Sequence, residues 1–535
     1  MKKIMKMITD NDTEYWPIPS GCFASLFLAG GYLGLAPVTI VHAVSIWLAG
    51  ELDHVHNLTL RHGGLLSFKL AGHTTNQPHN SAVFNYIRVQ DHSNFKAVRD
   101  DFTADSGFVM TVVDYILIEG GGNLLATNLS LDVNTLSIDD GGSLHADGIG
   151  YTPNTPKTDV TNLGIGTASS LGSSGGGHGG SSGLGAGTQT TGIPYGDFFE
   201  PDDIGSAGGG LDAAGGGGGL LYIRVNGTMW LDGEIRADGA AAAGSSGGGG
   251  SGGTVHLVIQ HIKGFGNITA NGGDQFPGGT GGGGAGGRIA VKFWRNETYR
   301  GTFQAHGGYA DVNKTSAEPG GPGPIFLFHE GEVHKTVYVE NNFRRSGTVG
   351  KVRDFDDLSD DYFKAWIIER DTDQKYLDGS NRSTTFDELQ IYGNAHLVVL
   401  PRDAAAGVFL HFRHMIGDRS GVLHVGPGQV MDLERAFIDT PFSTYIYPTA
   451  YLGLAPDTNI DQVFVQVRAT RTLGVCVCVC VCVCVCVCVC VSVCVCVCVC
   501  VCACVRAYVR MCVRARVRAR VRACVRAYVC IEYCI

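Results

Sequence analysis

Histidine and aspartate residues that could bind a metal gather near residue 54. His54 and His56 are two residues apart, so their side chains share one face of a strand, and Asp53 and His62 are close in sequence. Imidazole and carboxylate groups are zinc ligands. A polar strand face or a hydrogen-bonded turn has the same residues, and we favour that interpretation.

Carboxylates also recur at predicted turns, at Asp139, Asp140, Asp147 and Asp238. Carboxylate and carbonyl oxygens bind calcium, but Asp near Gly also suits the backbone of a tight turn. The glycine-aspartate nonapeptide of calcium-binding β-rolls is not repeated here. We therefore expect no metal ligand and no cofactor, with calcium as the alternative left open.

Catalytic motifs occur only in contexts that argue against them. Gly-x-Ser-x-Gly appears within glycine runs, around Ser174 and Ser246, and His329 and His334 are one residue too far apart for His-Glu-x-x-His. Glycine spacings that resemble a nucleotide-binding loop lack the helix that should follow. We identify no catalytic or cofactor-binding residue and expect a non-enzyme, with a polysaccharide lyase or hydrolase as the alternative.

Sequons for N-glycosylation are frequent and indicate the secretory pathway. Asn11 fits the pattern, and the candidates we retain are Asn57, Asn128, Asn226, Asn267, Asn296, Asn313 and Asn381. Chance matches in a chain rich in Ser and Thr are the competing explanation. We expect a secreted or cell-surface protein.

Composition narrows the class of protein. The chain has 535 residues, with 78 Gly and only 17% charged residues, which fits neither plain disorder nor an ordinary α/β enzyme. Residues 475–535 hold eight Arg and one Glu (+7), so the other residues carry −17 of the net charge of −10. An acidic body argues against nucleic acid as a partner.

One short phrase organises the middle of the chain. It reads Gly, any residue, a large apolar residue, any residue, Ala, a polar residue, Gly, and its Ala is Ala146, Ala237, Ala270 or Ala305. The apolar residue and the Ala lie two apart, so both should face the core from one strand. Further β-rich stretches lie at 220–225, 255–259 and 288–293. A spacing of 33 and 35 residues between the last three Ala predicts stacked repeats.

Long glycine runs separate these strands, the largest at 149–219. Glycine loses the most backbone entropy on folding, so such runs are either flexible or ordered by close packing of backbones, as in adjacent polyproline-II strands. The sequence leaves both alternatives open. We interpret the polar residues 73–108 as one long loop.

The chain divides by composition into five parts. We expect an N-terminal segment at 1–30, β-solenoid rungs at 31–148, glycine-rich repeats with interleaved rungs at 149–323, further rungs at 324–468, and a low-complexity tail at 469–535. The apolar, uncharged part of 17–50 allows a membrane-anchored protein as a third hypothesis. Its Pro and Gly content argues against a membrane span, and we do not expect anchoring there.

The end of the chain contains two unusual features. Tyr32–Pro37 recurs identically as Tyr451–Pro456, which predicts a second module copy and a fragment of a longer tandem array. From Val475 onward Val alternates mainly with Cys and Arg, and eighteen of the 19 Cys lie from Cys476 onward. Codons for these residues can alternate purine and pyrimidine, so we interpret the tail as unstructured, translated microsatellite DNA.

Residues 266–291, in which the phrase precedes a glycine run and then Arg288-Ile-Ala-Val, resemble very large glycine-rich, cell-surface or secreted repeat proteins, and the resemblance covers roughly residues 32–466. Residues 386–399 are similar to their rungs. The resemblance implies adhesin-like architecture and transfers no catalytic residue. We predict an all-β fold, a right-handed parallel β-helix (solenoid) of the pectin-lyase-like type with long glycine-rich loops. We expect a structural or adhesive extracellular protein with matrix or surface glycans as partners. A carbohydrate-binding or carbohydrate-cleaving β-helix is the alternative.

Overall fold

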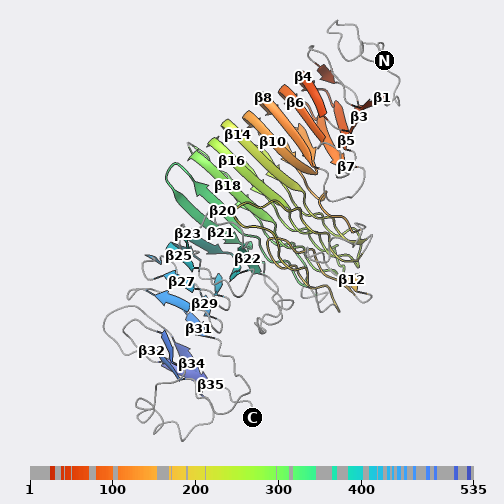
Figure 1. Ribbon diagram of the computed structural model, residues 1–535. Coiled ribbons are helices and arrows are strands. Elements are labelled where there is room, and N and C mark those ends of the chain that lie inside the picture. The colour runs from red at the N-terminus through yellow and green to blue at the C-terminus, as the bar shows by residue number, and fades with distance from the viewer. Residues whose placement is uncertain are drawn as a thin grey trace, which may run out of the picture. The chain divides into compact units, whose positions relative to one another are not determined.

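The computed structural model of the chain divides into two compact units, Met1–Trp366 and Ile367–Ile535, which we describe separately (Figure 1). None of the residues that it describes lies in an α-helix. The described residues are 24–29, 38–40, 43–49, 51–70, 80–99, 107–153, 168–169, 172–187, 191–210, 213–296, 298–311, 317–344, 364–369, 383–401, 409–418, 420–425, 430–433, 437–438, 443–446, 451–454, 462–465, 478–481, 487–490, 511–515 and 527–531.

In the first unit the chain alternates between two parallel sheets. The first sheet contains, in spatial order, β1 (Ala24–Ala29), β3 (Ala43–Ala49), β5 (Leu65–Leu70), β7 (Asn94–Arg99), β9 (Asn123–Ala126), β11 (Ser143–His145), β15 (Glu234–Arg236), β17 (Asn267–Thr269) and β19 (Thr302–Gln304). The second contains β2 (Val38–Ile40), β4 (Glu51–Leu60), β6 (Asn80–Val89), β8 (Phe108–Ile118), β10 (Asn128–Ile138), β14 (Leu220–Leu231), β16 (Thr254–Lys263), β18 (Arg288–Asn296) and β20 (Ile325–His329). Parallel, all-β architecture is therefore as predicted.

The repeated phrase forms the short strands of the first sheet. Leu144 of β11 pairs with Ile235, Ile235 with Ile268, and Ile268 with Phe303, all in parallel register. The Ala of each phrase is buried, with at most 1% of its surface exposed. The prediction that the apolar residue and the Ala face the core is confirmed, because period-two alternation places both on the same side.

A single apolar core fills the space between the two sheets. Inward residues of the second sheet stack strand on strand, as Leu221 lies beside Val255 and Val255 beside Ile289. At the other end of the core Phe68, Phe95 and Phe108 pack ring against ring, with centroids 5.4 and 5.8 Å from Phe68. The inward side chains of each strand are therefore fully buried only when the neighbouring strands of the stack are in place.

Irregular register recurs at a similar position in the second sheet. Pairing shifts between Phe84 and Tyr86, between Val133 and Leu136, and between Val225 and Thr228. Such β-bulges add a residue and bend a strand. The bulges are therefore aligned across the neighbouring strands β6, β8, β10, β14 and β16.

Residues 73–108 are not one loop, contrary to our prediction. They contain β6 and β7, whose side chains Phe84, Ile87 and Phe95 are fully buried. The bulge between Phe84 and Tyr86 interrupts the alternation of polar and apolar residues. This interruption hides the strand from a period-two reading of the sequence.

The glycine runs form an ordered layer beside the sheets, visible in Figure 1 as extended traces near β12 (Ala168–Ser169), which pairs with β13 (Gly172–Ser173). We call the described residues 172–187, 205–219, 239–253, 272–287 and 305–323 the glycine layer. Backbone hydrogen bonds connect its segments in a line of donors and acceptors, from Gly320 to Gly308, Gly284, Gly273, Gly250, Ala240 and Gly216, at 2.6–2.9 Å.

The segment 282–287 shows how the glycine layer is packed. It exchanges backbone hydrogen bonds with three other segments of the layer, through Gly176, Gly249, Gly308 and Glu318, and with Gly273 earlier in its own segment. A β-strand pairs with two neighbours only, whereas an extended segment with three residues per turn presents its peptide groups in several directions. For the parts of the glycine runs that the structure describes, the ordered alternative is therefore the correct one.

Glycine is required in this layer by close contact. A Cβ atom on Gly284 would lie 2.0 Å from the carbonyl oxygen of Gly250, and one on Gly308 would lie 1.9 Å from that of Gly273. Neither glycine has a positive φ angle. The absent side chain, and not an unusual backbone conformation, is what the packing needs.

An antiparallel hairpin follows the parallel strands of this unit. β20 pairs with β21 (His334–Glu340), so the sequence stretches expected as two further parallel rungs lie antiparallel. In the hairpin His329 lies opposite His334. The two histidines therefore lie at the strand ends on either side of the turn, and not on one face of a helix.

The second unit repeats the alternation on a smaller scale. One row of parallel strands is β23 (Ser383–Tyr392), β25 (Phe409–Gly417), β27 (Val430–Leu433) and β30 (Tyr451–Leu454), with β28 (Phe437–Ile438) beside β25. The other is β24 (His396–Pro401), β26 (Val422–Val425), β29 (Ser443–Ile446) and β31 (Gln462–Val465), while β22 (Lys364–Glu369) spans the boundary between units. Phe386 and Phe412 stack in its core with ring centroids 5.1 Å apart.

Several sequence predictions lie wholly or partly outside the described residues. Residues 1–23 and Tyr32–Pro37 are among them, and in the tail the structure describes β32 (Cys478–Val481), β33 (Val487–Cys490), β34 (Met511–Ala515) and β35 (Ala527–Ile531), which form two antiparallel pairs. Among the residues searched, no helix has the length and apolar character of a membrane span.

Candidate functional site

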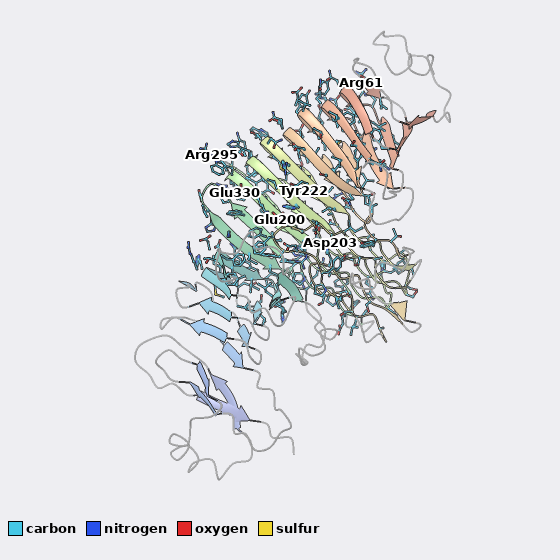
Figure 2. The ribbon with its side chains drawn as sticks, viewed as in Figure 1. Arg61, Glu200, Asp203, Tyr222, Arg295 and Glu330 are labelled. Atoms are coloured by element: carbon cyan, nitrogen blue, oxygen red, sulfur yellow. The ribbon has the colours of Figure 1, made fainter. Side chains whose placement is uncertain are left out.

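The largest group of buried ionisable side chains lies where the glycine layer meets the second sheet. A segment of 191–204, which we call the strap, crosses the first residues of β16, β18 and β20. Figure 2 labels two of its carboxylates, Glu200 and Asp203, and Tyr222 near the start of β14. Arg295 and Glu330 lie at the opposite ends of the strands.

Arg288 at the start of β18 anchors one end of the strap. Its side chain is fully buried, and Nε donates a 2.8 Å hydrogen bond to the carbonyl oxygen of Tyr195. The Tyr195 hydroxyl donates to the carbonyl oxygen of Ile204 at 2.5 Å and lies 3.0 Å from Ser206 Oγ. Burial raises the pKa of Tyr195, so its phenol stays protonated.

His178 of the glycine layer packs against Tyr195, with ring centroids 4.7 Å apart. Its Nδ1 lies 2.8 Å from the carbonyl oxygen of Gly252. Burial, together with the nearby charge of Arg288, lowers the pKa of His178 to about 3. The imidazole is therefore neutral at pH 7 and joins the layer to the strap.

The other end of the strap is held by an ion pair and by aromatic contacts. Lys292 Nζ lies 2.9 Å from Glu200 Oε1, and only 7% of the Lys292 side chain is exposed. Phe198 and Phe199 pack on Phe326, with ring centroids at 5.2 and 5.1 Å. These contacts bury the first part of β18 and of β20 under the strap.

His256 lies beside this ion pair. Its ring meets Tyr222 edge to face at 5.0 Å, and burial and the charge of Lys292 lower its pKa to about 4. A general acid or base acts best when its pKa is close to the working pH. Both buried histidines of this region are poorly matched to proton transfer at neutral pH and well suited to structural packing.

A second polar arrangement follows the repeated phrase. Asp147 Oδ1 accepts a 2.9 Å hydrogen bond from the backbone N of Asp238, and Asp238 Oδ1 accepts one of 2.5 Å from Asn271 N. Asn271 Oδ1 in turn accepts one of 2.8 Å from His306 N. The polar residue of each phrase thus caps the next strand of the stack. We call these four residues the cap ladder.

Charges differ along the cap ladder. Burial alone would raise the pKa of Asp147, but a hydrogen bond with His145 and the charge of Arg236 outweigh it and lower this pKa. Arg236 Nε lies 3.0 Å from Asp147 Oδ2. For Asp238, burial and the neighbouring charge of Asp147 raise the pKa to about 6. The ladder contains one firmly ionised carboxylate and one that titrates near pH 6.

The candidate metal residues are placed separately. His54 and His56 lie on β4 without described side chains, and His62 Nδ1 lies 3.4 Å from Asp91 Oδ2 at an exposed turn. Asp139 and Asp140 lie at another exposed turn, which Gly141 closes with a φ of 77°. Among the residues searched, no three His, Cys, Asp or Glu side chains are arranged to hold a metal ion.

The sequons differ in exposure. Asn226 and Asn296 are exposed, whereas Asn57, Asn128 and Asn267 are half-buried within strands. Asn313 and Asn381 lie outside the described residues. Period-two alternation explains part of this pattern, since Asn and the Ser or Thr two residues later share a strand face.

Sequence reasoning missed the strap and the contacts that make it. Its partners are remote in sequence, since Arg288 and Tyr195 are 93 residues apart. Aromatic and acidic residues concentrated at 195–203, between glycine runs, were the available signal. Comparisons with protein-family models, curated proteins and solved structures found no match.

Proposed function

We propose that this chain is a structural or adhesive extracellular protein, built as a right-handed parallel β-solenoid that acts as a stiff spacer. The observation that carries the proposal is the regular alternation of strands between two parallel sheets. One turn of chain contributes one strand to each sheet and then stacks on the previous turn. Stability in such a stack is distributed over neighbour contacts, which suits a load-bearing element.

The glycine layer supports the mechanical part of this proposal. Backbone hydrogen bonds cross it from segment to segment at 2.6–3.2 Å, alongside the sheets. The strap fastens the layer to the second sheet through Arg288, Lys292 and the aromatic contacts on Phe326. Bending the coil would have to break bonds in both networks, because they are joined along their length.

Expression of the full chain in secreting cells tests location and mechanics together. We expect antibody labelling of intact, unpermeabilised cells, and we expect purified protein pulled between its ends to unfold in repeated steps of similar length. A chain that stays in the cytosol contradicts the extracellular proposal. A single low-force unfolding event contradicts the load-bearing one.

Carbohydrate binding is the second candidate, and exposed aromatic side chains favour it. Trp230 of β14 has 46% of its surface exposed, with Lys263 Nζ 4.8 Å from its ring centroid. An exposed ring offers an apolar face to the C–H groups of a sugar, and a neighbouring cation offers a hydrogen-bond donor. Binding of the full chain to an array of polysaccharides, compared with a Trp230→Ala variant, separates this function from that of a spacer.

Cleavage of carbohydrate has less support. Glycosidases need two carboxyl groups that flank the bond to be broken. In the strap, Glu200 is engaged by Lys292. We therefore propose a non-enzymatic role, and hydrolysis of the polysaccharides that bind would argue against it.

A further inference from the structure

Asn296 differs from the other sequon asparagines that the structure describes. Both Asn296 and Thr298 are exposed, whereas the Ser or Thr of each other described sequon is half-buried or buried. Asn296 is also the last residue of β18. Its strand pairs with β20 only as far as Phe293, so among the described pairings Asn296 has a strand neighbour on one side, Ile262 of β16.

The turn after Asn296 fixes its side chain. Asn296 Oδ1 accepts a 2.9 Å hydrogen bond from the backbone N of Tyr299. Tyr299 is itself buried, and its hydroxyl donates a 3.0 Å bond to the carbonyl oxygen of Gly266. The amide oxygen is therefore held toward the protein by an anchored residue, which leaves Nδ2 as the outward atom.

Asn226, the other exposed asparagine among the described sequons, has the opposite arrangement. Its Nδ2 donates a 2.6 Å hydrogen bond to Asp132 Oδ1 on the neighbouring strand. Its partner residue in the sequon, Thr228, is only half exposed. A sugar on Nδ2 of Asn226 would remove this hydrogen bond between strands. A sugar on Nδ2 of Asn296 would remove no hydrogen bond that involves the described residues.

Asn267 shows why glycosylation is unfavourable at a half-buried position between two stacked strands. It lies between Glu234 and Thr302 on adjacent strands, and Thr302 Oγ1 donates a 2.7 Å bond to its Oδ1. Neighbouring strands lie about 4.8 Å apart. Because sugar is added before folding is complete, a glycosylated Asn267 has to be accommodated between two strands as they stack.

An aromatic ring lies beside Asn296. Trp294 is two residues earlier on β18, and 45% of its surface is exposed. A sugar on Asn296 would lie within reach of that ring and would bury part of it.

We propose that, of the sequon asparagines that the structure describes in the first unit, Asn296 is the one that is N-glycosylated and that the first sugar of the glycan packs on Trp294. The inference rests on the proposed extracellular location. The donor is an oligosaccharide joined through pyrophosphate to a lipid. Nδ2 forms a bond to the anomeric carbon and loses one proton, while the bond from that carbon to the pyrophosphate oxygen breaks and the lipid pyrophosphate leaves.

Glycopeptide mass spectrometry of the full chain from secreting cells tests the site. One preparation carries the native N-terminus and a second carries an added secretory leader, so that targeting and site choice are measured separately. We expect a glycan on Asn296 in both, and loss of one glycan in Asn296→Gln but not in Asn267→Gln. Folded, leader-directed protein with Asn267 occupied and Asn296 bare overturns the inference.

Targeting gives a separate outcome. Glycan on Asn296 in the leader-directed protein, together with no glycan at all in the native chain, overturns the extracellular proposal and with it the modification in the native protein. Glycans at other residues of the native chain, without one at Asn296, reject the site and leave the extracellular proposal standing.

The contact with Trp294 has its own test. In native protein, removal of the Asn296 glycan by an endoglycosidase should be about fivefold faster in Trp294→Ala, equivalent to roughly 1 kcal/mol of ring contact. Denatured samples of both proteins should be cleaved at equal rates. Equal rates in the native samples reject the contact with the ring.

Discussion

Arg288 Nε and the carbonyl oxygen of Tyr195 lie 2.8 Å apart, although 93 residues separate them in the sequence. This hydrogen bond connects the second sheet to the strap, and through Tyr195 and His178 it reaches the glycine layer. The second sheet and the glycine layer, which differ in their pattern of backbone hydrogen bonds, are thereby connected at the buried guanidinium of Arg288. The joint is specific enough to be tested residue by residue.

Loss of the ion pair between Glu200 and Lys292 should release the strap from the second sheet. In Glu200→Gln the ammonium of Lys292 loses its charged partner while it remains buried, which should cost about 2–4 kcal/mol of unfolding free energy. The double variant with Lys292→Met should recover most of the loss, because the buried charge is then absent. Chemical denaturation and protease cleavage at 191–204 measure both effects, and equal losses in the single and double variants would contradict the account.

A methyl group in the glycine layer should be poorly tolerated. Gly284→Ala places Cβ 2.0 Å from a carbonyl oxygen, so we expect a loss of roughly 3 kcal/mol or more, or failure to fold. Gly107→Ala is the matched control, since its Cβ would find its nearest neighbours at 3.7 Å and the glycine has no positive φ. The control should stay within about 0.5 kcal/mol of the natural protein in thermal denaturation.

Asp238 should make the cap ladder weaker at alkaline pH. Its pKa is raised from 3.8 to about 6 by burial and by Asp147, so its favourable contribution is complete below pH 3.8 and is lost as pH rises through 6. Asp238→Asn removes the penalty of the buried charge. We expect the variant to match the natural protein at pH 4.5 and to exceed it by about 1–2 kcal/mol at pH 8 in denaturant titrations.

His256 should contribute to acid sensitivity with the opposite sign. Its pKa is lowered from 6.5 to about 4, so the stability that depends on the neutral ring is present above pH 6.5 and is lost as pH falls toward 4. In His256→Phe, unfolding free energy should fall less steeply across this window. The two proteins should be similar at pH 8, and parallel curves between pH 6.5 and 4 would reject the assignment.

The sequence predicted the repeated strands well, but it did not predict the contacts that connect the second sheet, the strap and the glycine layer. Spacing of Ala237, Ala270 and Ala305 is a local signal, and the stacked strands follow from it directly. The glycine runs left two alternatives because composition alone cannot state which backbones lie together. The strap was missed since its contacts join Tyr195 to Arg288 and Glu200 to Lys292, across 93 and 92 residues, and no local period records such pairs.

The cap ladder falls between these cases. Asp147 and Asp238 were expected at turns, and they lie there, but each carboxylate serves the strand that stacks upon its own. Asp is favoured both in turns and as a hydrogen-bond acceptor that caps a neighbouring strand. Only the three-dimensional register distinguishes them.

The packing of segment 282–287 restricts how the gene for this protein can change. An inserted or deleted residue there would shift its hydrogen bonds against three other segments of the glycine layer together. Compensating changes would be needed in all of them at once. Length variation among related sequences should therefore appear as gain or loss of whole repeats, or at exposed tips such as Phe276 and Gly278, and not within the runs themselves.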